Sequence, residues 1–325
     1  MRIVFHGENA ASFSVGFAEL LTHGAEIVVL PDVLASESDR ASYAAADVVV
    51  GVRYDATLPR PERLALFHVP GAGFDAVDLP ALPAGALVCN CFGHETAIAE
   101  YVMSALLARH VPLADADSRL RRGDWAYWAG APERVHDELA EKTIGLLGFG
   151  HIGQAIAVRA KAFEMRVHVA NRSAVAESPG VDRWFALDDL AEFWGSADAL
   201  VVSLPLTAQT TGIVGAAAFA AMRPSAVVLN VGRGATIDEQ ALYDALASQR
   251  IAGAIIDTWY RYPAPGQGQV LPSALPFHTL PNIVMTPHMS AWTSGTIRRR
   301  QRVIADNIAR RFEGRPCLNV IRPMS

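Results

Sequence analysis

Two side chains in the last third of the sequence, Arg233 and His288, have the chemistry needed to reduce a 2-oxo acid. An arginine carries a permanent charge on a planar fork, so Arg233 could bind a carboxylate through two hydrogen bonds. A histidine titrates near neutral pH, so His288 could donate a proton to the oxygen that gains charge when a hydride reaches the carbonyl carbon. Arginines in turns and histidines after proline are often structural. The surrounding sequence must therefore decide between the two readings.

A glycine-rich segment, G-x-G-x-x-G at 148–153, directly follows an apolar run and opens a helix-like stretch. Gly148 permits a tight turn, Gly150 lets the backbone approach a pyrophosphate, and Gly153 allows close packing of the helix. The helix N-terminus adds N–H groups and a positive dipole end. A turn selected for packing alone is the alternative, but the flanking strand, helix and strand favour a dinucleotide site.

The residues after the next apolar run bear on the choice of cofactor. Asn171 lies 23 residues beyond Gly148, where a site for NAD usually has an acid that binds the ribose 2′-hydroxyl and repels a 2′-phosphate. Here the acid is absent, and Arg172 and Ser173 follow. This pattern favours NADP(H) over NAD(H). NAD(H) stays the alternative if Arg172 points to solvent or stacks on the adenine.

Composition excludes several classes of protein. The chain has 325 residues, a net charge of -5 and no basic run beyond 298–300, which argues against a nucleic-acid partner. No run of 18 apolar residues and no signal-like N-terminus occur, so we expect no membrane partner, a mature protein equal to the whole chain and a cytoplasmic location. Cys89 and Cys91 lie in an apolar run without further suitable ligands, so we expect no metal site.

Alternating short apolar runs and longer helix-like segments predict an α/β fold with two doubly wound parallel-sheet domains. The expected strands of the first domain are 2–6, 27–30, 48–52, 65–69 and 87–90. Those of the second domain are 143–147, 166–170, 199–203, 226–231, 253–257 and 283–286. A long helical period from 94 to about 121, which Pro112 should break, joins the two series, and 294–313 predicts a terminal helix.

Taken together, these segments resemble the D-isomer-specific 2-hydroxyacid dehydrogenase family, with its glyoxylate/hydroxypyruvate reductases, phosphoglycerate dehydrogenases, D-lactate dehydrogenases and, more distantly, formate dehydrogenases. The segments 70–79, 96–100, 203–207 and 230–234 carry the resemblance along with the glycine motif and His288. It implies a Rossmann cofactor domain, residues 99–289, inserted in a flavodoxin-like substrate domain, residues 1–98 and 290–325. It also implies a homodimer, which the segment 113–128 should help to form.

The resemblance further implies roles for individual residues. Backbone N–H groups at Ala72 and Gly73 should bind the far end of the substrate carboxylate. Arg53 could bind a phosphorylated or second carboxylate group, or be a surface arginine, and Trp292 could narrow the substrate pocket. Besides the glycines, Asn171 and Arg172, the implied cofactor contacts are His151, Ile152, Ser173, Leu204, Pro205, Thr210, Val231, Gly232 and Asp257.

One position departs from the family's pattern. Tyr262, five residues after Asp257 and just before Pro263, stands where the hydroxyacid dehydrogenases have a glutamate that hydrogen-bonds the catalytic histidine. A tyrosine is neutral near pH 7 and cannot stabilise an imidazolium equally well. The leading hypothesis is a reductase of a small 2-oxo acid. The alternatives are oxidation of a formate-like anion without proton transfer, and a dinucleotide-sensing protein similar to the family's corepressors.

Overall fold

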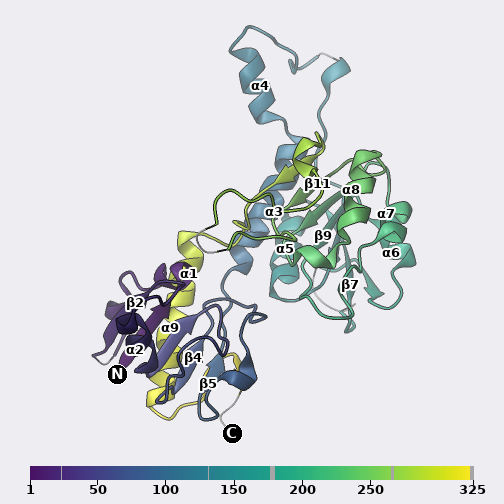
Figure 1. The fold of residues 1–325 in the computed structure, drawn as a ribbon. Helices are drawn as coiled ribbons and strands as arrows, with labels where there is room; N and C mark the ends of the chain where they lie inside the picture. The colour runs from purple at the N-terminus through teal and green to yellow at the C-terminus, as the bar shows by residue number, and fades with distance from the viewer. Residues whose placement is uncertain (23, 131, 176–179, 265–266, 323–325) are drawn as a thin grey trace. The chain divides into compact units, whose positions relative to one another are not determined.

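The computed structural model describes residues 1–22, 24–130, 132–175, 180–264 and 267–322. The chain forms two compact units, each with its own sheet (Figure 1). Unit 1 comprises Met1–Gly93, Ala264–Gln267 and Trp292–Ser325, and unit 2 comprises His94–Pro263 and Gly268–Ala291, apart from the positions not described. Most of unit 2 is thus inserted in the sequence of unit 1.

The sheet of unit 1 has the flavodoxin-like order. Its strands are β1 (Arg2–His6), β2 (Glu26–Leu30), β3 (Val48–Gly51), β4 (Leu66–His68), β5 (Leu87–Cys89) and β13 (Val320–Arg322). They lie in the order β13-β5-β4-β3-β1-β2, and all pairings are parallel except that of β13 with β5. The first five strands were predicted to within two residues. The edge strand β13 was not, because its pairing partners, Val88 and Cys89, lie at the other end of the chain.

Both faces of this sheet are covered, which is why its strands are nearly continuous runs of apolar residues. Besides α1 (Glu8–Ala11) and α2 (Glu37–Ala44), the long helix α9 (Ser294–Phe312) belongs to this unit. Ile304 and Ile308 of α9 pack with Val48 and Val50 in one core, while Val49 belongs to the core on the other face. Thr293 caps α9 by accepting a hydrogen bond from the Thr296 N–H, so the predicted terminal helix is confirmed.

Unit 2 contains an all-parallel sheet of the Rossmann type. Its strands are β6 (Thr143–Leu147), β7 (Arg166–Asn171), β8 (Arg183–Ala186), β9 (Ala199–Val202), β10 (Val227–Asn230), β11 (Gly253–Ile256) and β12 (Ile283–Met285). Their order is β12-β11-β10-β9-β6-β7-β8, with every neighbouring pair parallel. All were predicted except β8, whose polar and aromatic sequence does not read as a buried strand.

Helices on the two faces of this sheet bury alternate residues of each strand. On one face α3 (Glu95–His110) and α5 (His151–Ala162) pack over Val201 of β9. On the other face α6 (Ala191–Ser196), α7 (Ala216–Ala221) and α8 (Glu239–Ala247) pack over Leu200 and Val202. This alternation follows from the two-residue period of a strand, which points successive side chains to opposite faces of the sheet.

The long helical period around residue 100 is interrupted as predicted. Helix α3 ends at His110, and α4 (Leu113–Leu120) begins after Pro112. The segment with α4 projects from the body of unit 2 (Figure 1). Leu113, Trp125 and Trp128 on this segment are 75%, 65% and 61% exposed, which leaves large apolar side chains in water. No helix among the residues with described positions is long and apolar enough to span a bilayer.

Candidate active site

The predicted catalytic and cofactor-binding residues of unit 2 follow strands that are neighbours in its sheet. The glycine motif follows β6, the segment with Leu204 follows β9, Arg233 follows β10, Asp257 follows β11 and His288 follows β12. Since these strands are parallel and lie in the order β12-β11-β10-β9-β6, all five segments leave the same edge of the sheet. Ligands of open α/β sheets bind at this carboxyl edge.

The glycine motif has the geometry of a pyrophosphate cradle. Gly148 adopts φ +103°, a left-handed conformation that favours glycine. A Cβ at Gly153 would overlap the backbone carbonyl oxygen of Gly148, whereas one at Gly150 would meet no atom within 4 Å. Helix α5 begins at His151 without a side-chain cap. The start of α5, which has no side-chain cap, and the open space beside Gly150 therefore fit the phosphates of a dinucleotide.

The end of β7 is joined to this cradle through Asn171. Its amide oxygen accepts a hydrogen bond from the Phe149 N–H at 3.3 Å, and its amide nitrogen donates to the Ser173 carbonyl at 3.0 Å. Arg172 is exposed, and its side chain makes no hydrogen bond or ion pair with the residues whose positions are described. Among the residues that the structure describes, the end of β7 therefore presents a neutral amide and a cation, at the place where dinucleotide folds contact the adenosine ribose.

A threonine-bounded turn shapes the segment after β9. The Thr210 hydroxyl donates to the Pro205 carbonyl at 2.6 Å and accepts from the Thr207 N–H at 2.8 Å. Leu204 is buried and lies against two glycine loops. A Cβ built at Gly148 would lie 3.1 Å from Leu204 Cδ2, and one built at Gly232 would lie 2.8 Å from the Leu204 carbonyl oxygen. The segment thus packs against both the phosphate cradle and the loop that carries Arg233.

The backbone of Arg233 is held from within its own loop. The buried Asn230 side chain accepts from the Gly232 N–H at 3.1 Å and donates to the Arg233 carbonyl at 3.0 Å, and the Thr236 hydroxyl donates to the same carbonyl at 2.6 Å. A Cβ at Gly234 would overlap the backbone carbonyl of Trp259. These contacts fix the backbone position from which the Arg233 side chain extends. They also hold the Arg233 loop against the segment that follows β11.

Asp257 anchors the loop that carries His288. It is fully buried, and its carboxylate accepts hydrogen bonds from the Thr286 hydroxyl at 2.6 Å, the Met289 N–H at 2.8 Å and the Ser290 N–H at 2.9 Å. His288 itself has φ +59°, a left-handed conformation that costs a non-glycine residue energy. The buried carboxylate therefore stabilises a strained turn that presents the histidine at the sheet edge.

Tyr262 contacts His288 directly. The Tyr262 hydroxyl lies 3.0 Å from His288 Nδ1 and accepts a hydrogen bond from the Trp259 N–H at 3.1 Å. Desolvation lowers the pKa of His288; the negative charge of Asp257 raises it, and the positive charge of Arg233 lowers it further. Desolvation raises the pKa of Tyr262, which the Trp259 N–H and Arg233 oppose. The sequence therefore placed Tyr262 beside the histidine correctly.

Two hydrogen-bond contacts of the loop that carries His288 could not be predicted from the sequence. The Trp259 indole N–H donates to the Thr286 carbonyl at 2.8 Å, and the Tyr101 hydroxyl of α3 lies 2.8 Å from the Thr286 hydroxyl. Tyr101 is 185 positions from Thr286, so no local spacing could have linked them. Both contacts hold the peptide two residues before His288.

Three of the predicted substrate residues of unit 1 follow strands of its own sheet, and the fourth, Trp292, precedes α9. The Ala72 carbonyl, in the loop after β4, accepts from the Asn90 amide at 2.7 Å, and Gly73 beside it is exposed. Arg53, after β3, is half-buried and donates to the Asp32 carbonyl at 3.0 Å, so one of its donors is already used. Trp292 is 44% exposed and packs edge to face on Phe13.

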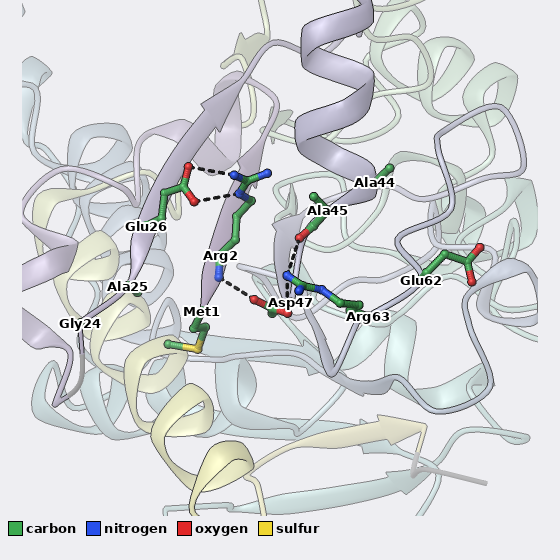
Figure 2. A pocket seen from close by; sticks show the side chains of 10 residues that line it. All are labelled: Met1, Arg2, Gly24, Ala25, Glu26, Ala44, Ala45, Asp47, Glu62 and Arg63. Carbon is green, nitrogen blue, oxygen red and sulfur yellow. Dashed lines mark hydrogen bonds and ion pairs between the residues drawn. The ribbon is translucent and has the colours of Figure 1, made fainter.

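A shallow depression of about 740 Å³ lies at the opposite, amino-terminal edge of the unit 1 sheet. Four of its charged side chains are paired with one another (Figure 2): Arg2 with Glu26 at 2.9 Å, and Arg63 with Asp47 at 3.2 Å. The Arg2 N–H also donates to Asp47 at 2.7 Å. These pairings engage four of its charged side chains, and the predicted catalytic and cofactor-binding residues lie elsewhere.

Comparisons with known proteins agree with this geometry. Residues 103–290 match the NAD-binding domain of D-isomer specific 2-hydroxyacid dehydrogenases. The chain is 32% identical over 269 residues to the D-3-phosphoglycerate dehydrogenase of Methanocaldococcus jannaschii, covering 81% of this chain but only 48% of that protein. It is 33% identical over 261 residues to glyoxylate/hydroxypyruvate reductase B of Salmonella newport, covering 78% and 76% of the two chains.

A solved structure matches nearly the full length. It is the NADPH-dependent glyoxylate/hydroxypyruvate reductase of Sinorhizobium meliloti in complex with NADP and malonate. The two chains are 26% identical with a TM-score of 0.76, and the match covers 98% of this chain and 96% of the other.

Proposed function

Because the chain belongs to the D-isomer-specific 2-hydroxyacid dehydrogenase family, we propose that it reduces a small 2-oxo acid of the glyoxylate or hydroxypyruvate type to the 2-hydroxy acid with NADP(H). The observation that carries the proposal is the set formed by Arg233, Tyr262 and His288 at the sheet edge that also bears the glycine cradle. When bound, the cofactor supplies the hydride.

In this proposal each residue has one task. Arg233 binds the substrate carboxylate with its fork, and His288 gives a proton to the oxygen on which charge develops. Asp257, through the three hydrogen bonds of its carboxylate, positions His288. Ala72, Gly73, Arg53 and Trp292 remain predicted substrate contacts.

A panel assay tests the proposal against its alternatives. Oxidation of NADPH is measured with glyoxylate, hydroxypyruvate and bulkier 2-oxo acids, and reduction of NADP⁺ is measured with formate. Turnover of an oxo acid supports the proposal. Turnover of formate alone would support anion oxidation without proton transfer. That alternative is favoured by Tyr262, which has no carboxylate at the position where the hydroxyacid dehydrogenases have a glutamate. Tight binding of NADPH with negligible turnover in the whole panel would indicate a dinucleotide sensor.

The cofactor preference rests on Asn171 and Arg172. We expect NADPH to bind more tightly than NADH by roughly one to two decades, since a charge-assisted hydrogen bond to a 2′-phosphate contributes about 1.5–3 kcal/mol. Fluorescence titration of the wild type and an Arg172→Gln variant checks this. The variant should raise the dissociation constant of NADPH and leave that of NADH unchanged, so NADH binding is the internal control. Equal dissociation constants for both cofactors in the wild type would contradict the assignment.

We also propose that the segment 113–128 forms part of a homodimer interface. Its exposed Leu113, Trp125 and Trp128 form the kind of apolar surface that a monomer rarely leaves in water. Sedimentation at micromolar concentration should show a dimer, and replacing both tryptophans with serine should shift it toward the monomer. A monomeric wild type would exclude the proposal.

A further inference from the structure

The hydroxyl of Tyr262 stands between a fixed donor and the imidazole of His288. The Trp259 N–H can only donate, so the Tyr262 oxygen accepts that hydrogen bond at 3.1 Å. The hydroxyl proton is then available for His288 Nδ1 at 3.0 Å. Tyr262 makes no other side-chain hydrogen bond with the residues whose positions are known. The arrangement in which Tyr262 donates and Nδ1 accepts therefore satisfies all three groups.

This direction of the hydrogen bond determines the tautomer of His288. An imidazole that accepts at Nδ1 carries its proton on Nε2 when it is neutral. Desolvation of the ring is the main effect that lowers the pKa of His288 and so disfavours a second proton, and the positive charge of Arg233 adds to it, whereas the negative charge of Asp257 opposes both. The resting form is therefore a neutral ring with a donor at Nε2.

A neutral ring cannot release its Nε2 proton by itself, because an imidazolate would form. It can do so if Nδ1 gains a proton in the same step. Resting on the proposed reductase function, we propose that Tyr262 acts through His288 as a proton relay: it holds the Nε2–H tautomer and passes its own proton to Nδ1 as the Nε2 proton leaves.

The step balances. The hydride adds to the carbonyl carbon, the π electrons move to the oxygen, and that oxygen takes the proton from Nε2. The N–H bond at Nδ1 forms as the O–H bond of Tyr262 breaks, which returns a neutral imidazole and leaves a phenolate. Desolvation raises the pKa of Tyr262 and so disfavours the phenolate, as does the charge of Asp257, while the Trp259 N–H and the charge of Arg233 stabilise it. Tyr262 is 50% exposed, so water can return the proton.

The relay differs from a histidine that must be protonated beforehand. If an imidazolium were the acid, reduction would decline as His288 loses its proton. With the relay, the proton starts on a phenol, and desolvation keeps the pKa of Tyr262 above its usual value. Reduction should then continue above the pH at which His288 is neutral, and decline only as Tyr262 ionises.

Two variants separate the relay from a merely structural tyrosine. Tyr262→Phe removes the hydroxyl and keeps the ring. Tyr260→Phe is the matched control, because the Tyr260 hydroxyl donates to the Ile237 carbonyl at 3.2 Å and has no contact with His288. We expect kcat/KM for reduction to fall by about 10²-fold in Tyr262→Phe, within the usual range for loss of a general acid, and to change little in Tyr260→Phe. The residual activity of Tyr262→Phe should follow the protonation of His288.

The tautomer is measured without substrate or cofactor. In ¹⁵N-histidine NMR near pH 8, the His288 signal, assigned by its loss in a His288→Gln variant, should show a protonated Nε2 and an unprotonated Nδ1. A protonated Nδ1 would overturn the relay. So would a wild-type activity that declines together with His288 protonation, or a Tyr262→Phe profile equal to that of the wild type. If no oxo acid is turned over, the proposed function fails, and the relay with it; the NMR tautomer still reports whether Tyr262 positions His288.

Discussion

Replacing Arg233 with lysine is expected to lower kcat/KM for the 2-oxo acid by about 10²- to 10⁴-fold, the equivalent of one or two charge-assisted hydrogen bonds at about 1.5–3 kcal/mol each. Lysine keeps the charge but presents a point donor in place of the planar fork. The held backbone of Arg233, with its carbonyl bound by Asn230 and Thr236, gives a shorter side chain no means of shifting toward the substrate.

Steady-state kinetics and cofactor titration check this expectation together. Both kcat and the apparent affinity for the oxo acid should fall, while the dissociation constant of NADPH should stay near that of the wild type. Arg261→Lys is a matched control, because Arg261 is an exposed arginine on the segment after β11. An Arg233→Lys enzyme with nearly full kcat/KM would mean that Arg233 is structural.

Replacing Asp257 with asparagine should both destabilise unit 2 and impair the reaction. The carboxylate receives a hydroxyl and a backbone N–H on Oδ1 and a second backbone N–H on Oδ2. Asparagine has one oxygen, so in either orientation its NH₂ group faces the N–H of Met289 or of Ser290. Leaving such a buried donor unsatisfied costs about 1–3 kcal/mol, and the loss of a charged acceptor adds to it. We expect the free energy of unfolding to fall by about 3 kcal/mol.

The same substitution should loosen the turn at His288, whose left-handed conformation depends on those hydrogen bonds. Hydrogen exchange of the Met289 and Ser290 amides should become faster, and kcat/KM should fall with it. Asp244→Asn serves as the control, since Asp244 is exposed and its carboxylate accepts only from the Gln240 side chain among the residues with described positions. Unchanged exchange at both amides in Asp257→Asn would refute the anchoring role.

The sequence by itself determined the features that depend on local pattern. Strands such as 143–147 were predictable because a strand covered on both faces is a short apolar run, and the glycine motif because each glycine meets a local steric demand. The break at Pro112 follows from a missing N–H. Arg233 and His288 directly follow predicted parallel strands, so their positions at the carboxyl edge of the sheet were predictable too.

Tertiary structure decided everything that depends on partners distant in the chain. Strand β13 exists because β5 offers it an unpaired edge, not because of its own three residues. Asp257 proved to be the anchor of the His288 turn, and Tyr101 and Trp259 reach Thr286 from other segments. The direction of the Tyr262 hydrogen bond depends on a backbone N–H that no residue type encodes. Hydrogen bonds are short and directional, so a sequence can place two groups on one edge, but only packing determines which donor meets which acceptor.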